Sequence, residues 1–276
     1  MQYSVLMSVY QKEVPEYLAI CLESLINQTI VPDEIVIVKD GELTRDLDNI
    51  ILKYQKLKPN LFKIVELEVN QGLGKALGIG LNSCSHEIVA RMDSDDICVS
   101  TRFEKQLKFL CENPDISIVG TWISEFEKDA KEIVSVRKVP TSHEEIFKAA
   151  KKRNPLNHMS VMFRKEAVIN SGGYRHFLWN EDYYLWVRML KSGYRFANIE
   201  EPLVLVRAGV SLFERRGGIQ YLIKELELQK EFVGMQFITR SEFVVNLFIR
   251  SIFRILPNRI RGMMYKYLLR EKEANL

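Results

Sequence analysis

The chain has 276 residues, 47% hydrophobic and 27% charged, a balance typical of a globular protein that excludes collagen-like, low-complexity and intrinsically disordered classes. Its net charge of +3 comes from the C-terminal part: residues 243–270 hold six basic residues and no acidic one, which leaves 33 basic and 36 acidic residues elsewhere. A nucleic-acid-binding function is therefore not indicated for the chain as a whole.

Neither a membrane span nor a signal peptide is expected. No stretch approaches the roughly 20 consecutive apolar residues of a spanning helix, and residues 1–4 lead into an apolar run without a basic segment or cleavage site. The four cysteines, Cys21, Cys84, Cys98 and Cys111, have no paired short spacing, so neither a disulfide framework nor a zinc ribbon is indicated. We therefore expect a cytoplasmic protein.

The first 120 residues alternate between short apolar runs and helical patterns. Buried strands are expected at residues 3–9, 34–38, 61–67 and 87–92, and helices at 15–27 and from residue 73 to about 82. This alternation predicts βαβ units and a mostly parallel sheet. Because ligands of such sheets bind beyond the C-terminal ends of the strands, the side chains at these ends are the first candidates for a functional site.

Beyond residue 120 the alternation loosens. Short strands are expected at residues 160–163, 196–199 and 203–206, a helix at 182–191, and a helical run from Gly218 to about residue 232. One α/β domain followed by a helical tail is the simplest division.

Three carboxylates, Asp93, Asp95 and Asp96, directly follow the expected strand at 87–92. They repel one another unless a cation neutralises them, and hard oxygen ligands suit Mg²⁺ or Mn²⁺. A solvated acidic turn has the same pattern. An EF-hand is excluded because Ile97 and Cys98 stand where its loop requires a ligand and a glycine.

Six motifs together resemble those of family 2 glycosyltransferases with the GT-A fold, and in particular bacterial enzymes of capsule and exopolysaccharide assembly such as those of amylovoran biosynthesis. They occupy residues 4–10, 24–29, 35–41, 70–76, 93–96 and 180–182. The resemblance implies an α/β GT-A fold with one Rossmann-like, mostly parallel sheet flanked by helices. It implies a catalytic domain at 1–215, with a nucleotide-sugar half to about residue 120 and an acceptor half beyond it, and a helical extension at 216–276.

The resemblance also assigns residues to the binding of the nucleotide-sugar donor. It implies that Asp40 accepts a hydrogen bond from the uracil ring of the nucleotide, and that Ser8 and Tyr10 border the base. Asp40 also fits a plain turn, and Lys39 stands where the family often has another aspartate. Lys75, at the start of a helix, would reach a phosphate, unless it is a solvated surface lysine.

The resemblance also implies a metal site for Mn²⁺ or Mg²⁺. Asp96 would be its ligand, Asp95 would contact the ribose and the water shell of the metal, and Asp93 would shape the nucleotide pocket. The metal would bridge the phosphates of the donor. The family commonly has a further histidine ligand after the last strand, but none lies near Arg207; the arginines at 215–216 either close over the diphosphate or begin a helix.

On the acceptor side, the resemblance implies that Asp182 is the general base that removes a proton from the acceptor hydroxyl. Glu181 would hold the acceptor and Trp179 would offer an aromatic platform for a sugar. His158 would face the acceptor, or else be a satisfied, half-buried histidine. Two acids at the start of a helix also complement the helix dipole, which is the structural alternative.

We therefore expect an inverting, metal-dependent transferase that moves a sugar from a nucleotide sugar, a UDP-sugar, to a lipid-linked saccharide of a surface polysaccharide. The first alternative is a sugar-phosphate nucleotidyltransferase, which needs a glycine-rich phosphate loop that residues 8–11 do not provide. The second is a non-catalytic nucleotide-sugar-binding protein. The presence of two acidic groups, at residues 93–96 and 181–182, argues against it.

The basic tail suggests contact with a membrane. Residues 243–256 are apolar nearly all round, and one arc of this helix holds Asn246, Arg250, Ser251 and Arg254. After Pro257, the basic residues Arg259, Lys266 and Arg270 share a face. Such helices suit an anionic lipid surface, so we expect residues 243–270 to dock peripherally on the inner face of the cell membrane. Alternatively, they cover the catalytic domain or a partner subunit.

Overall fold

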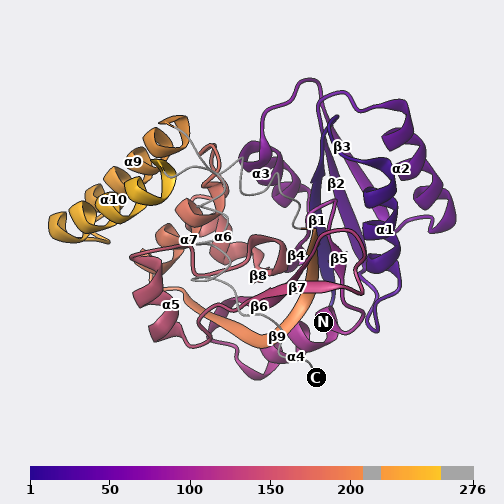
Figure 1. Cartoon of the computed structure of the whole chain (residues 1–276). Coiled ribbons are helices and arrows are strands. Elements are labelled where there is room, and N and C mark those ends of the chain that lie inside the picture. Colours follow the sequence, from indigo (N-terminus) through magenta and orange to yellow (C-terminus); the bar gives the residue numbers. More distant parts are fainter. Residues whose placement is uncertain (208–218, 256–276) are drawn as a thin grey trace.

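The computed structural model describes residues 1–207 and 219–255 (Figure 1). Within these residues, nine strands form one sheet in the order β3-β2-β1-β4-β8-β6-β9-β5, with β7 paired to β6. The first four strands are parallel: β1 (Tyr3–Val9), β2 (Glu34–Asp40), β3 (Phe62–Leu67) and β4 (Ile88–Arg91). The expected α/β class and the positions of the four expected strands are therefore confirmed, but β3, at the edge of the sheet, is not the buried strand that was expected.

The second half of the sheet is mixed. It contains β5 (Ile97–Cys98), β6 (Ile116–Phe126), β7 (Ile133–Arg137), β8 (Met162–Arg164) and β9 (Arg195–Arg207). β8 runs antiparallel to β4 and β6, whereas β9 runs parallel to β6 and antiparallel to β5. β9 is one strand where two short ones are expected, because its register against β6 shifts next to Pro202 and the apolar pattern is interrupted there.

Helices cover both faces of the sheet (Figure 1). One face packs against α1 (Pro15–Ile26), α2 (Arg45–Leu57) and α4 (Arg102–Glu112). The other packs against α3 (Leu73–Ser83), α5 (His143–Ala150), α6 (Lys165–Asn170) and α7 (Glu181–Lys191), and a short 3₁₀ helix, η1, spans His158–Ser160. Side chains of a strand alternate between the two cores, as Val5 and Met7 against Leu6 in β1 illustrate.

α3 lies very close to the sheet. A Cβ atom added to Gly80 would lie 2.5 Å from Cγ2 of Val38 and 2.6 Å from Cδ1 of Leu6. Because such distances are shorter than real contacts allow, only glycine lets this helix approach the strands. This approach fixes the C-terminal half of α3 against β1 and β2.

The chain continues with α9 (Ile219–Gly234) and α10 (Arg240–Ile255), which pack side by side (Figure 1). Leu228 and Phe232 of α9 join the core on the α3 face of the sheet. A domain boundary at residue 215 remains a prediction. In the part of the chain that the structure describes, no helix combines the length and the apolar character required to cross a bilayer.

Candidate active site

The acidic segment at residues 93–96 follows β4 in the middle of the sheet. Asp96 is buried, and its Oδ1 accepts a hydrogen bond from the backbone N–H of Arg207 at 3.1 Å. Burial raises the pKa of Asp96 well above its usual value, and the charges of Asp95 and Asp93 raise it further. Asp93 and Asp95 are partly exposed. Carboxylates this crowded favour a bound cation.

Arg91, the last residue of β4, connects this acidic segment to a second one. It is buried and forms an ion pair with Asp93. Its charge also opposes the effect of burial on the pKa of Glu181 and of Asp182, so it lies within electrostatic reach of both. Its Nε and Nη1 groups find no hydrogen-bond partner among the described residues. No role is predicted for Arg91 from the sequence, although it is a basic residue in an otherwise apolar strand.

The second acidic group lies in the first turn of α7. Asp182 is held on both oxygens: Oδ2 accepts a hydrogen bond from Nδ2 of Asn154 at 2.6 Å, and Oδ1 accepts one from the backbone N–H of Tyr183 at 2.7 Å. Burial raises the pKa of Asp182. Burial, followed by the charge of Asp182, raises the pKa of Glu181 to about 7. Asn154 has no sequence signal that distinguishes it from a loop asparagine.

Trp179 lies in the loop before α7 and faces the C-terminal helices. Its backbone is left-handed, with φ 67°, which is uncommon for a bulky side chain. Its ring stacks on Tyr221 of α9, with 5.1 Å between centroids and 7° between planes. The side chain is 43% exposed, so part of the ring still meets solvent. Its role as a sugar platform remains a prediction.

His158 is buried in η1 and faces an aromatic partner. Its Nε2 lies 3.0 Å from Oη of Tyr174, a hydrogen bond whose direction depends on the histidine tautomer. Burial, followed by the charge of Arg91, lowers the pKa of His158 well below its usual value. The ring is therefore neutral near pH 7. This placement matches a satisfied histidine, and its contact with the acceptor remains a prediction.

Asp40 organises the loop that leads into α3. It is buried at the end of β2, and its Oδ1 and Oδ2 accept hydrogen bonds from the backbone N–H groups of Gln71 and Gly72 at 2.7 and 3.0 Å. Each carboxylate oxygen can accept a second hydrogen bond, so a contact with the uracil ring remains open as a prediction. Lys75 is exposed in the first turn of α3.

The donor loop before α3 and the acceptor loop before α7 meet at Gly74. A Cβ atom added there would lie 2.5 Å from the carbonyl oxygen of Arg175 and 3.0 Å from Cβ of Glu181. Glycine is therefore required for the two loops to touch. This contact brings residues that are expected to bind donor and acceptor to one edge of the sheet.

The remaining donor-side residues lie at the ends of β1 and β2. Ser8, near the end of β1, and Tyr10, directly after this strand, are both partly exposed. Lys39, which stands where the family often has an aspartate, pairs with Asp48 at 2.9 Å and Glu66 at 2.8 Å. Its charge is therefore neutralised by α2 and β3.

The motif at residues 24–29 holds the segment that follows the acidic cluster. Oγ of Ser24 accepts a hydrogen bond from the backbone N–H of Cys98 at 3.0 Å. Nε2 of buried Gln28 donates to the carbonyl oxygen of Val99 at 3.0 Å, and its Oε1 accepts from the N–H of Phe103 at 3.4 Å. These bonds tie α1 to the chain after β4, a structural role that the motif alone does not reveal.

Arg207 closes the site from the end of β9. Its guanidinium lies 3.7 Å from the ring centroid of Tyr17 and 4.7 Å from that of Phe126, while its backbone N–H binds Asp96. These contacts fix the strand end at which the family often has a histidine. The following residues, including the arginines at 215–216, lie outside the described part of the chain.

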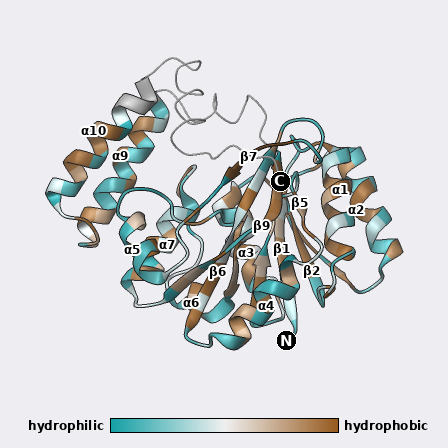
Figure 2. Ribbon diagram, turned by 60° about the horizontal axis from the view of Figure 1, so that its bottom comes forward, coloured by the Kyte–Doolittle hydropathy of each residue, from teal (hydrophilic) through white to brown (hydrophobic). Residues whose placement is uncertain are grey.

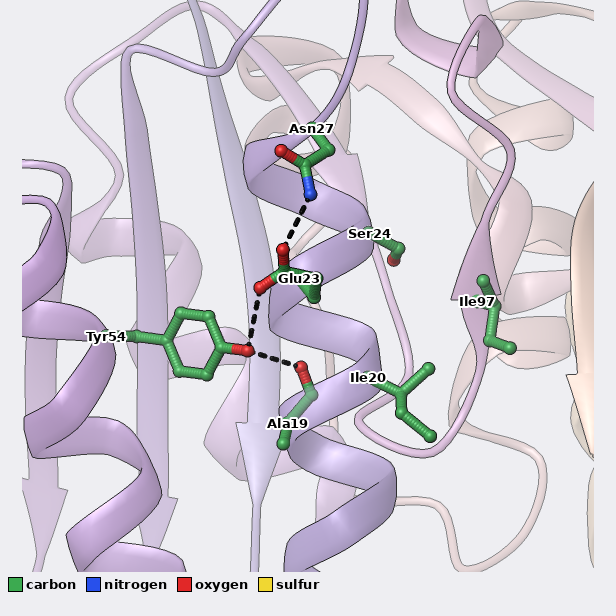
Figure 3. A pocket seen from close by; sticks show the side chains of 7 residues that line it. All are labelled: Ala19, Ile20, Glu23, Ser24, Asn27, Tyr54 and Ile97. Atoms are coloured by element: carbon green, nitrogen blue, oxygen red, sulfur yellow. Dashed lines mark hydrogen bonds between the residues drawn. The ribbon is translucent and has the colours of Figure 1, made fainter.

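An open hollow lies elsewhere, between α1, α2 and β5 (Figure 3). It is lined by Ala19, Ile20, Glu23, Ser24, Asn27, Tyr54 and Ile97. Glu23 links its two sides, because it accepts hydrogen bonds from Asn27 at 2.9 Å and from the hydroxyl of Tyr54 at 3.0 Å (Figure 3). None of the candidate site residues lines this hollow, so it is not the site built above.

Comparison with known proteins gives consistent matches. Residues 4–172 match the family model described as "Glycosyl transferase family 2". The chain is 40% identical over 264 residues to the amylovoran biosynthesis glycosyltransferase AmsE of Erwinia amylovora, covering 96% of this chain and 98% of that protein. It is 39% identical over 269 residues to the Escherichia coli UDP-Gal:alpha-D-GlcNAc-diphosphoundecaprenol beta-1,3-galactosyltransferase, covering 98% and 97%.

A solved structure shows the same fold. The mannosyltransferase PcManGT from Pyrobaculum calidifontis, in complex with GDP-Man and Mn²⁺, superposes with a TM-score of 0.63 at 17% identity. The match covers 94% of this chain and 71% of that one.

Proposed function

The chain belongs to glycosyl transferase family 2 and has the expected GT-A fold, and from this premise we propose that it moves one sugar from a UDP-sugar to a lipid-linked saccharide during assembly of a surface polysaccharide. The Escherichia coli relative is named for UDP-Gal and for a saccharide on diphosphoundecaprenol, and the Erwinia relative for amylovoran biosynthesis. Identity near 40% over almost the full chain supports carrying over these classes of donor and acceptor.

One observation carries the proposal: two acidic groups, 85 or more residues apart in the sequence, lie within electrostatic reach of the same buried arginine. The acidic group around Asp96 is suited to bind a cation and, through it, a diphosphate. The acidic group around Asp182 is suited to act as a general base. A sugar transfer needs both functions at one place, whereas nucleotide binding alone needs only the first.

The carboxylates of Asp95 and Asp96 fit a divalent metal. They supply hard oxygen ligands, and burial beside other acids raises the pKa of Asp96, as expected of a carboxylate whose charge is not offset. Among the described residues, no three acidic, histidine or cysteine side chains form a complete metal cluster. The phosphates of the donor would therefore supply further ligands. A Mn²⁺ or Mg²⁺ ion bound there would offset the charge of the departing nucleoside diphosphate. The PcManGT complex contains Mn²⁺.

Asp182 has the position of a general base. Asn154 and the N–H of Tyr183 fix its carboxylate, and each oxygen can still accept one more hydrogen bond. Asp182 would take the proton of the acceptor hydroxyl, whose oxygen then attacks the anomeric carbon as the bond to the diphosphate breaks on the opposite face. A single displacement of this kind inverts the anomeric configuration.

The surrounding side chains complete the proposal. Burial raises the pKa of Asp182, and the hydrogen bonds from Tyr183 and Asn154, followed by the charge of Arg91, oppose this rise. Glu181, with a pKa of about 7, could exchange a hydrogen bond with the acceptor in either protonation state. Trp179 and neutral His158 would bound the acceptor.

The nucleotide would lie against the other loop. Asp40 and Tyr10 would contact the base, Ser8 and Asp93 would line its pocket, Asp95 would contact the ribose, and Lys75 would reach a phosphate. This arrangement follows the family resemblance and the position of each residue at the sheet edge.

The test is a nucleotide-release assay with Mn²⁺, a panel of nucleotide sugars, and a synthetic diphosphate-linked N-acetylglucosamine on a short lipid. We expect UDP release that depends on the acceptor, together with an acceptor heavier by one sugar. Release of pyrophosphate from UTP and a sugar phosphate would instead indicate a nucleotidyltransferase. Binding of UDP-sugars without turnover of any of them would indicate a binding protein.

A further inference from the structure

α10 presents an apolar face to solvent. Val244 is 62% exposed, Val245 55%, Phe248 67% and Ile249 48%. At 3.6 residues per turn, these four side chains fall within an arc of about 140°. Figure 2 shows hydrophobic segments along this helix, at the outer end of the molecule. A contiguous exposed apolar face of this kind usually marks a contact surface.

The opposite side of α10 faces the protein, where Phe243 packs against the core and polar side chains form hydrogen bonds. Nδ2 of buried Asn246 donates hydrogen bonds to the carbonyl oxygen of Lys151 at 2.7 Å and to Oε1 of Gln229 at 3.0 Å. Arg250 forms an ion pair with Glu225, which is buried in α9. The helix cannot turn its apolar face inward without breaking these bonds. The side of α10 that faces solvent is thus more apolar than that of an ordinary surface helix.

We infer that the apolar face of α10, formed by Val244, Val245, Phe248 and Ile249, docks the enzyme on an anionic lipid bilayer. This inference rests on the proposed lipid-linked acceptor. It differs from the sequence-based expectation in one respect: Asn246 and Arg250, which belong to the polar arc of this helix, bind protein and do not face the lipid headgroups.

Charge favours lipid over a second copy of the chain. Residues 254–270, which continue from this helix, include Arg254, Arg259, Arg261, Lys266 and Arg270 and no acidic residue. Basic residues that follow an apolar helix face in the sequence favour anionic headgroups, which attract them. In a second copy of the chain the same residues carry the same charge and offer no such attraction.

Docking there would place the active site next to the membrane. The inner face of α10 binds residues directly before Asn154: Asn246 donates to Lys151, and Nη2 of Arg250 donates to the carbonyl oxygen of Lys152 at 2.6 Å. Asn154 in turn holds Asp182. The proposed base is therefore separated from the docking helix by only one short segment, which suits an acceptor anchored in lipid.

The test is sedimentation of the full chain with vesicles that contain no acceptor. We expect binding to vesicles of phosphatidylglycerol and phosphatidylcholine, little binding to pure phosphatidylcholine, and weaker binding at high salt. Phe248→Glu should lower the partition coefficient by about tenfold or more, because it removes a large apolar side chain from the contact. Leu52→Glu is the matched control, since Leu52 is 50% exposed on α2 and the charge change is the same.

Equal binding of the two variants, or equal binding to both kinds of vesicle, would overturn the inference. So would a dimer in analytical ultracentrifugation that Phe248→Glu converts to monomers while neither form binds vesicles. A short water-soluble acceptor keeps the two proposals separate. Vesicle binding without sugar transfer would contradict only the proposed function, and transfer to the soluble acceptor without vesicle binding would contradict only the docking.

Discussion

Asp182 is the residue on which the proposed chemistry depends. Replacing it with asparagine keeps the size of the side chain and one of its two accepted hydrogen bonds but removes the base. We expect Asp182→Asn to lower kcat by about 10²–10⁴-fold, the usual contribution of general-base catalysis, without changing the affinity for UDP. Steady-state kinetics and calorimetric titration with UDP measure the two quantities.

Asn154→Ala is the matched control for position alone, because it removes one of the two hydrogen bonds that hold Asp182 and leaves the carboxylate. A smaller fall in kcat is expected for it. If Asp182→Asn weakened UDP binding as much as it slowed turnover, Asp182 would be a donor-site residue.

Glu181 makes the stability of the protein depend on pH. Its pKa is raised from 4.5 to about 7 by burial and by Asp182, so its neutral form is favoured in the folded state. Its stabilising contribution is therefore complete below about pH 4.5 and is lost as the pH rises through about 7. We expect Glu181→Gln to remove this loss, which amounts to up to about 3 kcal/mol.

Urea unfolding of wild type and Glu181→Gln between pH 5 and pH 8 measures this difference in the free energy of unfolding. Glu112→Gln, at an exposed position on α4, is the control. Parallel pH profiles for wild type and Glu181→Gln would show that the carboxyl titrates as it does in the unfolded chain.

Most candidate site residues were predictable from the sequence because their motifs lie at the ends of strands and helices. In a parallel sheet the C-terminal ends of the strands lie at the same edge, so these residues lie near one another. Arg91 and Asn154 were not predictable. Arg91 belongs to a strand, and only the structure shows that its charge reaches acids from two distant segments. Asn154 acts through one hydrogen bond to Asp182, a partner that lies 28 residues further along the chain.

At the level of elements, the contact between α1 and the segment after β4 should govern the donor site. Gln28→Leu keeps the volume but leaves the carbonyl of Val99 and the N–H of Phe103 without this partner. The carbonyl of Val99 still accepts a hydrogen bond from the N–H of Arg102 at 2.9 Å, so the N–H of Phe103 is the group left unpaired. One such buried group costs about 1–3 kcal/mol, so we expect a loss of stability in that range together with weaker UDP binding.

Thermal unfolding and UDP titration test this expectation. Asn27→Ala changes the neighbouring, exposed side chain and should alter stability by less than about 0.5 kcal/mol. Normal UDP affinity in a destabilised Gln28→Leu variant would show that the hydrogen bonds of Gln28 support the fold but not the donor site.

The strands β1, β2 and β4 follow the sequence pattern because each buries a continuous apolar run. No prediction is made from the sequence for α2, α4 or β6. In α2 the buried residues are Leu47, Ile51 and Tyr54, while Leu52 and Leu57 are exposed, so its apolar residues do not form one clean stripe. The start of α2 depends on a hydrogen bond from the N–H of Leu47 to the side chain of Thr44. The antiparallel pairings of β8 depend on long-range contacts, which local periodicity does not encode.

For the whole molecule, binding of nucleotide and metal should be coupled to stability. A ligand at 100 times its Kd stabilises the folded state by about 2.7 kcal/mol. We expect UDP with Mn²⁺ to raise the Tm, UDP with EDTA to raise it less, and Asp96→Ala to abolish the difference between the two. Differential scanning fluorimetry measures all three. An Asp96→Ala variant that still responds to Mn²⁺ would place the metal elsewhere.

The central claim is that both acidic groups act together in one inverting sugar transfer, and the configuration of the product tests it most directly. The enzyme would be given an α-linked UDP-sugar, Mn²⁺ and the diphosphate-linked acceptor, and the new glycosidic bond examined by proton NMR. Wild type should form a β-linked product, and Asp182→Asn should form it about 10²–10⁴-fold more slowly. An α-linked product, or a β-linked product formed at an undiminished rate by Asp182→Asn, would contradict it.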